Sequence, residues 1–192
     1  GVEIDCIYCD MTDESSIKSA IQPLLKAKRQ IDVLINNAGV ATGSFLQMNT
    51  MQQIRDVFQI NFFSHVYITQ MISKLMMRQK SGVIINMGSV AGLENFAGYT
   101  AYGSSKAAIM LFTKTIAREL APYGIRVNAI APGLTDTGMA GQMEEKAWHE
   151  MVGRTDLNRL GKPEEIAKTI VWLASDASSF MTGQIVRVDG GM

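Results

Sequence analysis

The chain has 192 residues, 47% of them hydrophobic, and its eighteen basic and eighteen acidic residues give a formal net charge of zero. This length suits one domain with a substantial core, and the balanced charge argues against nucleic acid or an anionic membrane as a partner. The apolar runs are too short to span a membrane and no signal peptide is visible, so we expect a cytoplasmic protein.

The first third of the chain alternates short apolar runs with amphipathic stretches. Residues 3–9 are typical of a strand, and Thr12 is a plausible cap for a helix over 13–28. Residues 31–36 form a second apolar strand. Apolar side chains that recur every three or four residues predict a long helix over about 50–79.

The rest of the chain continues this alternation. Strands are predicted at 83–87, 125–130 and 183–188, and helices at about 101–122 and 162–175. Short apolar strands that alternate with amphipathic helices indicate crossover units and therefore an α/β fold with a parallel sheet.

Cys6 and Cys9 form a Cys-x-x-Cys pair, a spacing found in redox and zinc sites. Residues three apart in a strand point to opposite faces, and the sequence offers no second pair of ligands. We therefore expect no metal site and interpret both residues as buried, reduced thiols.

The strongest chemical signal lies between the strand at 83–87 and the helix that follows it. Tyr102 and Lys106 are four residues apart, so a helix places a phenol beside an ammonium. Chance supplies roughly 0.25 such pairs in this composition, and roughly 0.02 when a serine is also required at the position of Ser89. Tyr102 is a candidate acid; the alternative is an amphipathic helix with an ordinary exposed lysine.

Four loops of unusual composition follow the predicted strands. They are Asp10-Met11, Asn37-Ala38-Gly39, the loop from Ser89 onward, and Pro132 to Thr137. Ligands of parallel sheets bind beyond the carboxyl ends of the strands, so these loops predict one site.

These segments resemble the short-chain dehydrogenase/reductase family, and most of all its 3-oxoacyl-[acyl-carrier-protein] reductases. The matching segments are Asn36-Asn37-Ala38-Gly39, Asn61, Ser89, Tyr102-x-x-x-Lys106, Pro132-Gly133 with Thr137, residues 159–167, Thr182-Gly183-Gln184 and Val188-Asp189-Gly190-Gly191. The resemblance implies a doubly wound, Rossmann-like parallel sheet with helices on both faces, which forms one dinucleotide-binding and catalytic domain over residues 1–192. It also implies hydride transfer between NAD or NADP and a carbonyl or secondary alcohol.

The resemblance assigns four catalytic roles. Tyr102 is the general acid in reduction and the base in oxidation, and Lys106 lowers its proton affinity and holds the nicotinamide ribose. Ser89 donates a hydrogen bond to the substrate oxygen, and Asn61 supports a water that relays protons to Lys106. A free tyrosine titrates near 10, so a nearby cation is needed to make it effective at neutral pH. For Asn61 the alternative is a simple bond to backbone.

The same resemblance assigns the cofactor contacts. They are Asp10, Met11, Asn37, Ala38, Gly39, Tyr102, Lys106, Pro132, Gly133, Thr135 and Thr137. Asp10 and Met11 are placed at the adenine, and Thr135 contributes only its backbone, because the family usually has isoleucine there. In the alternative interpretation Asp10 caps a helix, the Asn-Ala-Gly segment is only a turn, and Pro132-Gly133 only ends a strand.

The family's glycine-rich pyrophosphate loop and its first two strands have no counterpart in the sequence. In the family's strand order those strands separate residues 3–9 from residues 31–36, so we expect a gap in the sheet and unpaired strand edges. We expect an incomplete sequence; the alternative is a catalytically silent, truncated member that acts as a binding or regulatory protein. The choice between NAD and NADP normally lies in the absent part.

Substrate and assembly leave weaker signals. Substrate contacts are expected at Leu93, Phe96, Tyr99 and the lid-like segment 134–157. Four side chains of that segment predict an adaptable apolar wall, which favours an acyl chain, steroid or aromatic ketone, unless they only pack in the core: Met139, Met143, Trp148 and Met151. Glu94 and Asn95 leave a polyol open. The helices at 50–79 and 101–122 have wide apolar faces, and in the family they build an interface between subunits, so we expect a homotetramer.

Overall fold

The computed structural model describes residues 3–136 and 152–192. Its α-helices are α1 (Glu14–Lys26), α2 (Met51–Phe58), α3 (Ser64–Gln79), α4 (Thr100–Leu120) and α6 (Pro163–Ala174), and its strands are β1 (Val33–Asn36), β2 (Gly82–Met87), β3 (Ile125–Pro132) and β4 (Ile185–Val188). A π-helical turn, η2 (Gln59–Phe63), joins α2 to α3, and short 3-10 turns are η1 (Leu46–Met48), η3 (Val90–Gly92), η4 (Ala121–Tyr123) and η6 (Asp176–Ser178). Within these ranges, every helix is too short or too polar to cross a membrane.

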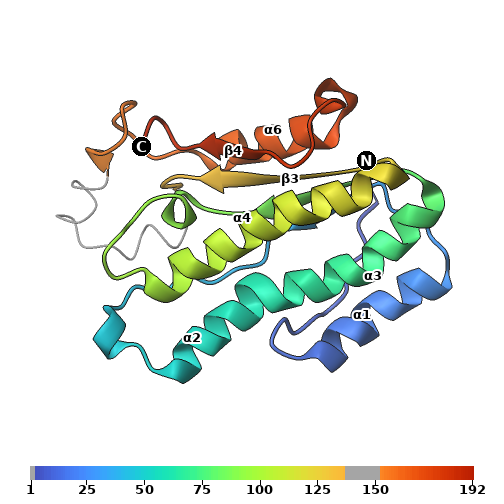
Figure 1. Ribbon diagram of the computed structural model, residues 1–192, viewed down its shortest axis with the longest axis horizontal. Helices are drawn as coiled ribbons and strands as arrows, with labels where there is room; N and C mark the ends of the chain where they lie inside the picture. The colour runs from blue at the N-terminus through green and yellow to red at the C-terminus, as the bar shows by residue number, and fades with distance from the viewer. Residues whose placement is uncertain (1–2, 137–151) are drawn as a thin grey trace.

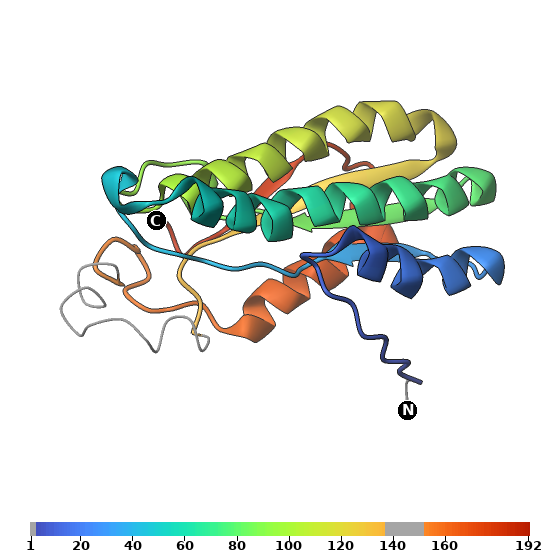
Figure 2. The same ribbon diagram turned by 90° about the horizontal axis from the view of Figure 1, so that it is seen from below.

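The four strands form one parallel sheet in the order β1-β2-β3-β4. Helices α2, α3 and α4 lie on one side of this sheet and α6 lies on the other (Figures 1 and 2). Because all strands run in the same direction, their carboxyl ends meet at one edge of the sheet. The predicted α/β fold, with a doubly wound parallel sheet and helices on both faces, is confirmed.

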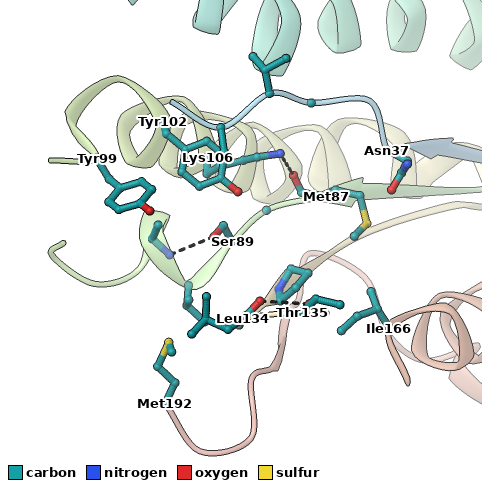
Figure 3. Close-up of a pocket in the computed structure, with 18 of the residues that line it drawn as sticks. Asn37, Met87, Ser89, Tyr99, Tyr102, Lys106, Leu134, Thr135, Ile166 and Met192 are labelled. Carbon is teal, nitrogen blue, oxygen red and sulfur yellow. Dashed lines mark hydrogen bonds between the residues drawn. The ribbon is translucent and has the colours of Figure 1, made fainter. Parts of the chain in front are cut away.

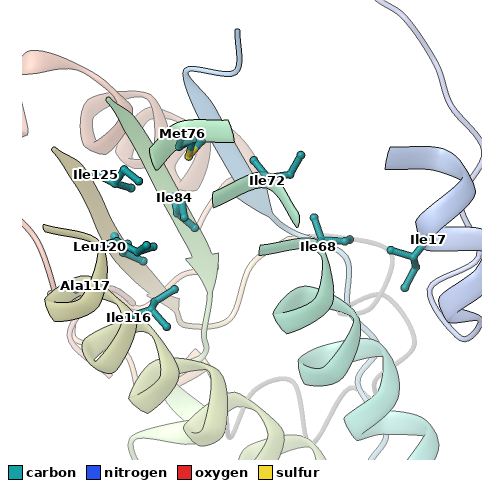
Figure 4. Close-up of a cluster of buried hydrophobic side chains, with 10 residues drawn as sticks. Ile17, Ile68, Ile72, Met76, Ile84, Ile116, Ala117, Leu120 and Ile125 are labelled. Atoms are coloured by element: carbon teal, nitrogen blue, oxygen red, sulfur yellow. The ribbon is translucent and has the colours of Figure 1, made fainter. Parts of the chain in front are cut away.

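Two apolar clusters hold these layers together. Ile84 of β2 packs with Ile72 and Ile116 between the sheet and helices α3 and α4 (Figure 4). Its neighbour Ile85 points to the opposite face and packs with Ile166 of α6. Successive side chains of a strand alternate between faces, so a continuous apolar run such as Val83 to Ile85 is required where both faces are covered.

The predicted strand at residues 3–9 is wrong. This segment forms no strand, and Tyr8 is 86% exposed. A strand is stabilised by a hydrogen-bonded neighbour, and no strand in the described part of the chain pairs with this segment. The interpretation of both cysteines as buried fails for the same reason: Cys6 is exposed and Cys9 is only partly buried.

The outer edge of β1 is open, as expected from the missing strands, because no strand of the described residues pairs with it. Ile35 in this strand is correspondingly exposed. Nearby, the cap of α1 is Asp13 rather than the predicted Thr12. The Asp13 carboxylate accepts hydrogen bonds from the backbone amides of Ser15 and Ser16, which caps the helix.

The long helix predicted over 50–79 is continuous but irregular. Thr50 caps α2 in a capping box with Gln53. The helix then widens into the π-helical turn η2, which contains Asn61, before α3 begins. Such turns are frequent at functional sites because the extra residue changes where a side chain points.

Helix α4 packs against η3 through Gly103. A Cβ atom placed on Gly103 would lie 2.5 Å from the carbonyl oxygen of Ala91, which is too close for any real contact. We expect Gly103→Ala to lower the free energy of unfolding by about 1–3 kcal/mol despite its better helix propensity. Urea unfolding measures this, with Gly43→Ala as the control because a Cβ there has nothing within 4 Å. Equal losses in both variants would contradict the packing argument.

Candidate active site

A cavity of about 560 Å³ opens at the carboxyl ends of the strands (Figure 3). The predicted site residues that line it are Asn37, Gly39, Ser89, Tyr102, Lys106, Pro132, Gly133 and Thr135. They come from the loops after β1 and β2, from the end of β3 and the loop after it, and from the first turns of α4. The structure therefore brings most of the predicted residues into one space.

Ser89, Tyr102 and Lys106 lie together in this cavity (Figure 3). Ser89 lies two residues beyond the end of β2, and its hydroxyl accepts a hydrogen bond from the Ala91 amide, which starts η3. Tyr102 and Lys106 occupy successive turns of α4, and the ammonium lies 5.8 Å from the centre of the tyrosine ring. Lys106 is only 4% exposed, and its Nζ donates to the Met87 carbonyl oxygen at 2.8 Å.

Burial is the main influence on the pKa values of this pair, and the expected effect of Lys106 on the proton affinity of Tyr102 stays a prediction. Burial raises the pKa of Tyr102 above its usual 10.0, although a hydrogen bond with Ser89 opposes this shift. Burial also lowers the pKa of Lys106 from 10.5 to about 8. In both cases the largest cause is the cost of taking the charged form out of water.

Asn61 is fully buried and fixes the loop after β1 through two hydrogen bonds to Val40. Its Oδ1 accepts from the Val40 amide at 2.9 Å, and its Nδ2 donates to the Val40 carbonyl at 2.9 Å and to the Ser105 hydroxyl at 3.0 Å. Asn61 thus bonds both backbone and a side chain, and its support of a proton-relaying water stays a prediction. A Cβ on Gly39 would lie 3.3 Å from both Asn61 Oδ1 and Lys106 Nζ. The absence of a side chain at Gly39 therefore lets the backbone of this loop lie close to both polar groups.

The remaining predicted residues lie in three places. Ala38 and Met11 line a second hollow beside the open edge of β1. Asp10 lines neither cavity; its carboxylate accepts from the amide and hydroxyl of Thr12 at 2.8 and 2.7 Å, as a turn-forming acid does. Thr137 lies outside the described residues, as does most of the segment 134–157. The adenine contact of Asp10 stays a prediction.

One end of the cavity is aromatic, because Phe96 and Tyr99, both expected near the substrate, line it. The predicted apolar wall of Met139, Met143, Trp148 and Met151 lies outside the described residues. The rings of Phe96 and Tyr99 are 6.5 Å apart, and those of Tyr99 and Tyr102 are 6.0 Å apart, both in edge-to-face geometry. Sequence reasoning missed Met192, which lies across the cavity from Tyr99 (Figure 3). Sequence reasoning also missed Ile166 of α6, which lines the same cavity. The helical spacing of Ile166 predicts that its side chain is buried but does not predict which cavity it lines.

His65, on α3, is a buried histidine that the sequence did not single out. Burial lowers its pKa from 6.5 to about 4, and the charge of Lys106 acts in the same direction. Between these pH values the unfolded chain binds a proton that the folded protein does not, so stability falls as the pH drops. We expect wild type to lose about 2 kcal/mol more than His65→Leu between pH 7 and 4.5. Urea unfolding at both pH values measures this, and equal losses would contradict it.

The chain matches a family model described as enoyl-(acyl carrier protein) reductase over residues 1–192. It is 40% identical over 190 residues to the 3-oxoacyl-[acyl-carrier-protein] reductase FabG of Thermotoga maritima. The aligned region covers 99% of this chain and 77% of that relative.

Solved structures agree with this comparison. A putative gluconate dehydrogenase from Agrobacterium tumefaciens superposes with a TM-score of 0.93 at 33% identity, covering 98% of this chain and 75% of the other. A xylitol dehydrogenase with NAD⁺ bound superposes with a TM-score of 0.87 at 32% identity, covering 95% of this chain and 77% of the other. ElxO with NADP bound superposes with a TM-score of 0.86 at 30% identity, covering 95% of this chain and 75% of the other.

Proposed function

Because the chain belongs to the short-chain dehydrogenase/reductase family, we propose that residues 1–192 act as one domain that transfers hydride between NAD or NADP and a carbonyl or secondary alcohol. The observation that carries this proposal is the convergence of Ser89, Tyr102 and Lys106 in one cavity at the carboxyl edge of the sheet. A phenol, a hydroxyl and a buried amine are the groups needed to bind and protonate a carbonyl oxygen.

The residues around the cavity fit a nicotinamide cofactor. Gly39 leaves room for close approach beside Lys106, whose amine suits ribose hydroxyls. Pro132, Gly133 and Thr135 border the cavity after β3 and offer backbone groups to a carboxamide. When bound, the reduced cofactor supplies the hydride.

In reduction the side chains act on the substrate oxygen. The Ser89 hydroxyl donates a hydrogen bond to that oxygen, and the Tyr102 hydroxyl donates its proton to it as the carbon accepts hydride. Burial keeps Tyr102 protonated, which suits an acid. Lys106, as an ammonium below a pH of about 8, favours the phenolate left behind. Asn61 holds the loop that carries Gly39, and its link to a proton-relaying water is part of the proposal.

The aromatic end of the cavity supports a 3-oxoacyl thioester as substrate, since Phe96, Tyr99 and Met192 offer an apolar surface to an acyl chain. The test follows NADH and NADPH absorbance with 3-oxoacyl thioesters, steroids and sugars. We expect NADH or NADPH to be oxidised when a 3-oxoacyl thioester is present. Turnover of sugars alone would contradict the substrate class, and cofactor binding without any turnover would indicate a silent binding protein.

The exposed apolar residues of α4 and η2 support a homotetramer. Leu111 and Phe63 are exposed, while Ile109 is buried within the chain and is therefore not available to a partner. Light scattering is expected to give the mass of four chains of 21.0 kDa. A monomer mass would contradict this assembly.

A further inference from the structure

A network of charged groups joins the two sides of the cavity mouth. Arg187, in β4, contacts the Glu94 carboxylate with its Nη1 at 2.7 Å, and Glu94 belongs to the loop that carries Phe96 and Tyr99. The same guanidinium donates through Nε to Asp189 Oδ2 at 2.7 Å and through Nη2 to the carbonyl oxygen of Met192. One side chain thus holds both the aromatic loop and the carboxyl-terminal residue.

These contacts lead directly to the wall of the cavity. Phe96, Tyr99 and Met192 all line it, and Met192 lies across from Tyr99 (Figure 3). Arg154 makes a second attachment of the same loop, with its guanidinium carbon 5.7 Å from the centre of the Phe96 ring. The backbone before Arg187 is held in the sheet by β3, so the network is anchored on a rigid element.

We propose that Arg187 is a positioning residue that sets the width of the apolar end of the cavity by fixing the loop 93–99 and Met192 relative to each other. An isolated exposed ion pair contributes little, but a planar guanidinium that engages several acceptors forms a network with defined geometry. A lysine at this position would keep the positive charge but lose the planar set of donors that engages several acceptors at once. A cavity end held at a fixed width is expected to favour long acyl chains, a consequence that rests on the proposed function.

The first test is independent of activity. Hydrogen exchange of residues 93–99 is compared in wild type, Arg187→Met and Glu94→Gln. Arg159→Met is the matched control, because Arg159 pairs with Glu165 at 2.8 Å with side chains 47% and 40% exposed, similar to the 38% and 41% of Arg187 and Glu94. Exchange is expected to be about two- to fivefold faster in both network variants and unchanged in the control. Unchanged exchange in both network variants would overturn the proposal.

The second test addresses specificity with 3-oxoacyl thioesters of short and long chain. In Arg187→Met the preference in kcat/KM for the long chain is expected to fall about threefold through KM, with kcat for the short chain within about twofold of wild type. Arg187→Lys is expected to retain only part of the wild-type preference for the long-chain thioester. Faster exchange with an unchanged preference would overturn the specificity role. A wild-type chain that oxidises no NAD(P)H would refute the proposed function, while the exchange measurement would still decide the role of Arg187.

Discussion

Replacing Tyr102 with phenylalanine is expected to lower turnover by about 10²- to 10⁴-fold, the usual contribution of a matched general acid. The substitution removes one oxygen and keeps the ring, so the edge-to-face contact with Tyr99 remains. Binding of the cofactor should be retained, because Lys106, Gly39 and the loop after β3 are untouched. Stopped-flow absorbance gives the turnover, and NAD(P)H fluorescence gives the binding.

Tyr123→Phe is the control for this experiment. Tyr123 lies in η4, just beyond the other end of α4, and does not line the cavity. Its variant is expected to turn over substrate like wild type. Unchanged turnover in Tyr102→Phe would refute the assignment of the acid, whatever the control does.

Lys106→Met is expected to separate activity from stability. Turnover should fall about 10²-fold or more, because the cation that favours the phenolate is lost. Stability at pH 7 should instead rise by about 2 kcal/mol: burial lowers the pKa of Lys106 from 10.5 to about 8, so the folded protein bears the cost of a buried charge. The new methionine leaves the Met87 carbonyl without its donor, which reduces the gain.

The pH dependence gives this prediction a second signature. Between about 8 and 10.5 the unfolded chain keeps the Lys106 proton that the folded protein releases, so wild type becomes more stable as the pH rises. The advantage of Lys106→Met should therefore shrink by about 2 kcal/mol between pH 7 and 9.5 in urea unfolding. Lys114→Met, an exposed position on α4, should show neither effect. A constant difference across this range would contradict the buried charge.

The sequence predicted the sheet well where a strand has at least one hydrogen-bonded neighbour within the described residues. Ile84 and Ile85 belong to a continuous apolar run because helices cover both faces of β2, and that pattern is visible without a structure. Residues 3–9 show a similar pattern but form no strand, since local propensity cannot supply a hydrogen-bonded neighbour. Pairing is a property of the whole sheet.

The candidate site was predictable where it depends on spacing. Ser89, Tyr102 and Lys106 meet because a strand end and one helical face fix their positions. The pKa of Tyr102 was not predictable, because its shift depends on how deeply the phenol is buried. The contact between Arg187 and Glu94 joins residues more than ninety positions apart, and no local pattern in either segment indicates it.

Hydride transfer itself is tested most directly by isotope labelling. The chain is incubated with NADH or NADPH that carries two deuterium atoms at the nicotinamide C4 and with a 3-oxoacyl thioester, and the alcohol product is analysed by mass spectrometry. We expect one deuterium at the carbinol carbon in wild type and a strongly reduced yield of labelled product in Tyr102→Phe. An alcohol without deuterium, or no alcohol at all with any of the carbonyl substrates, would contradict the proposed function.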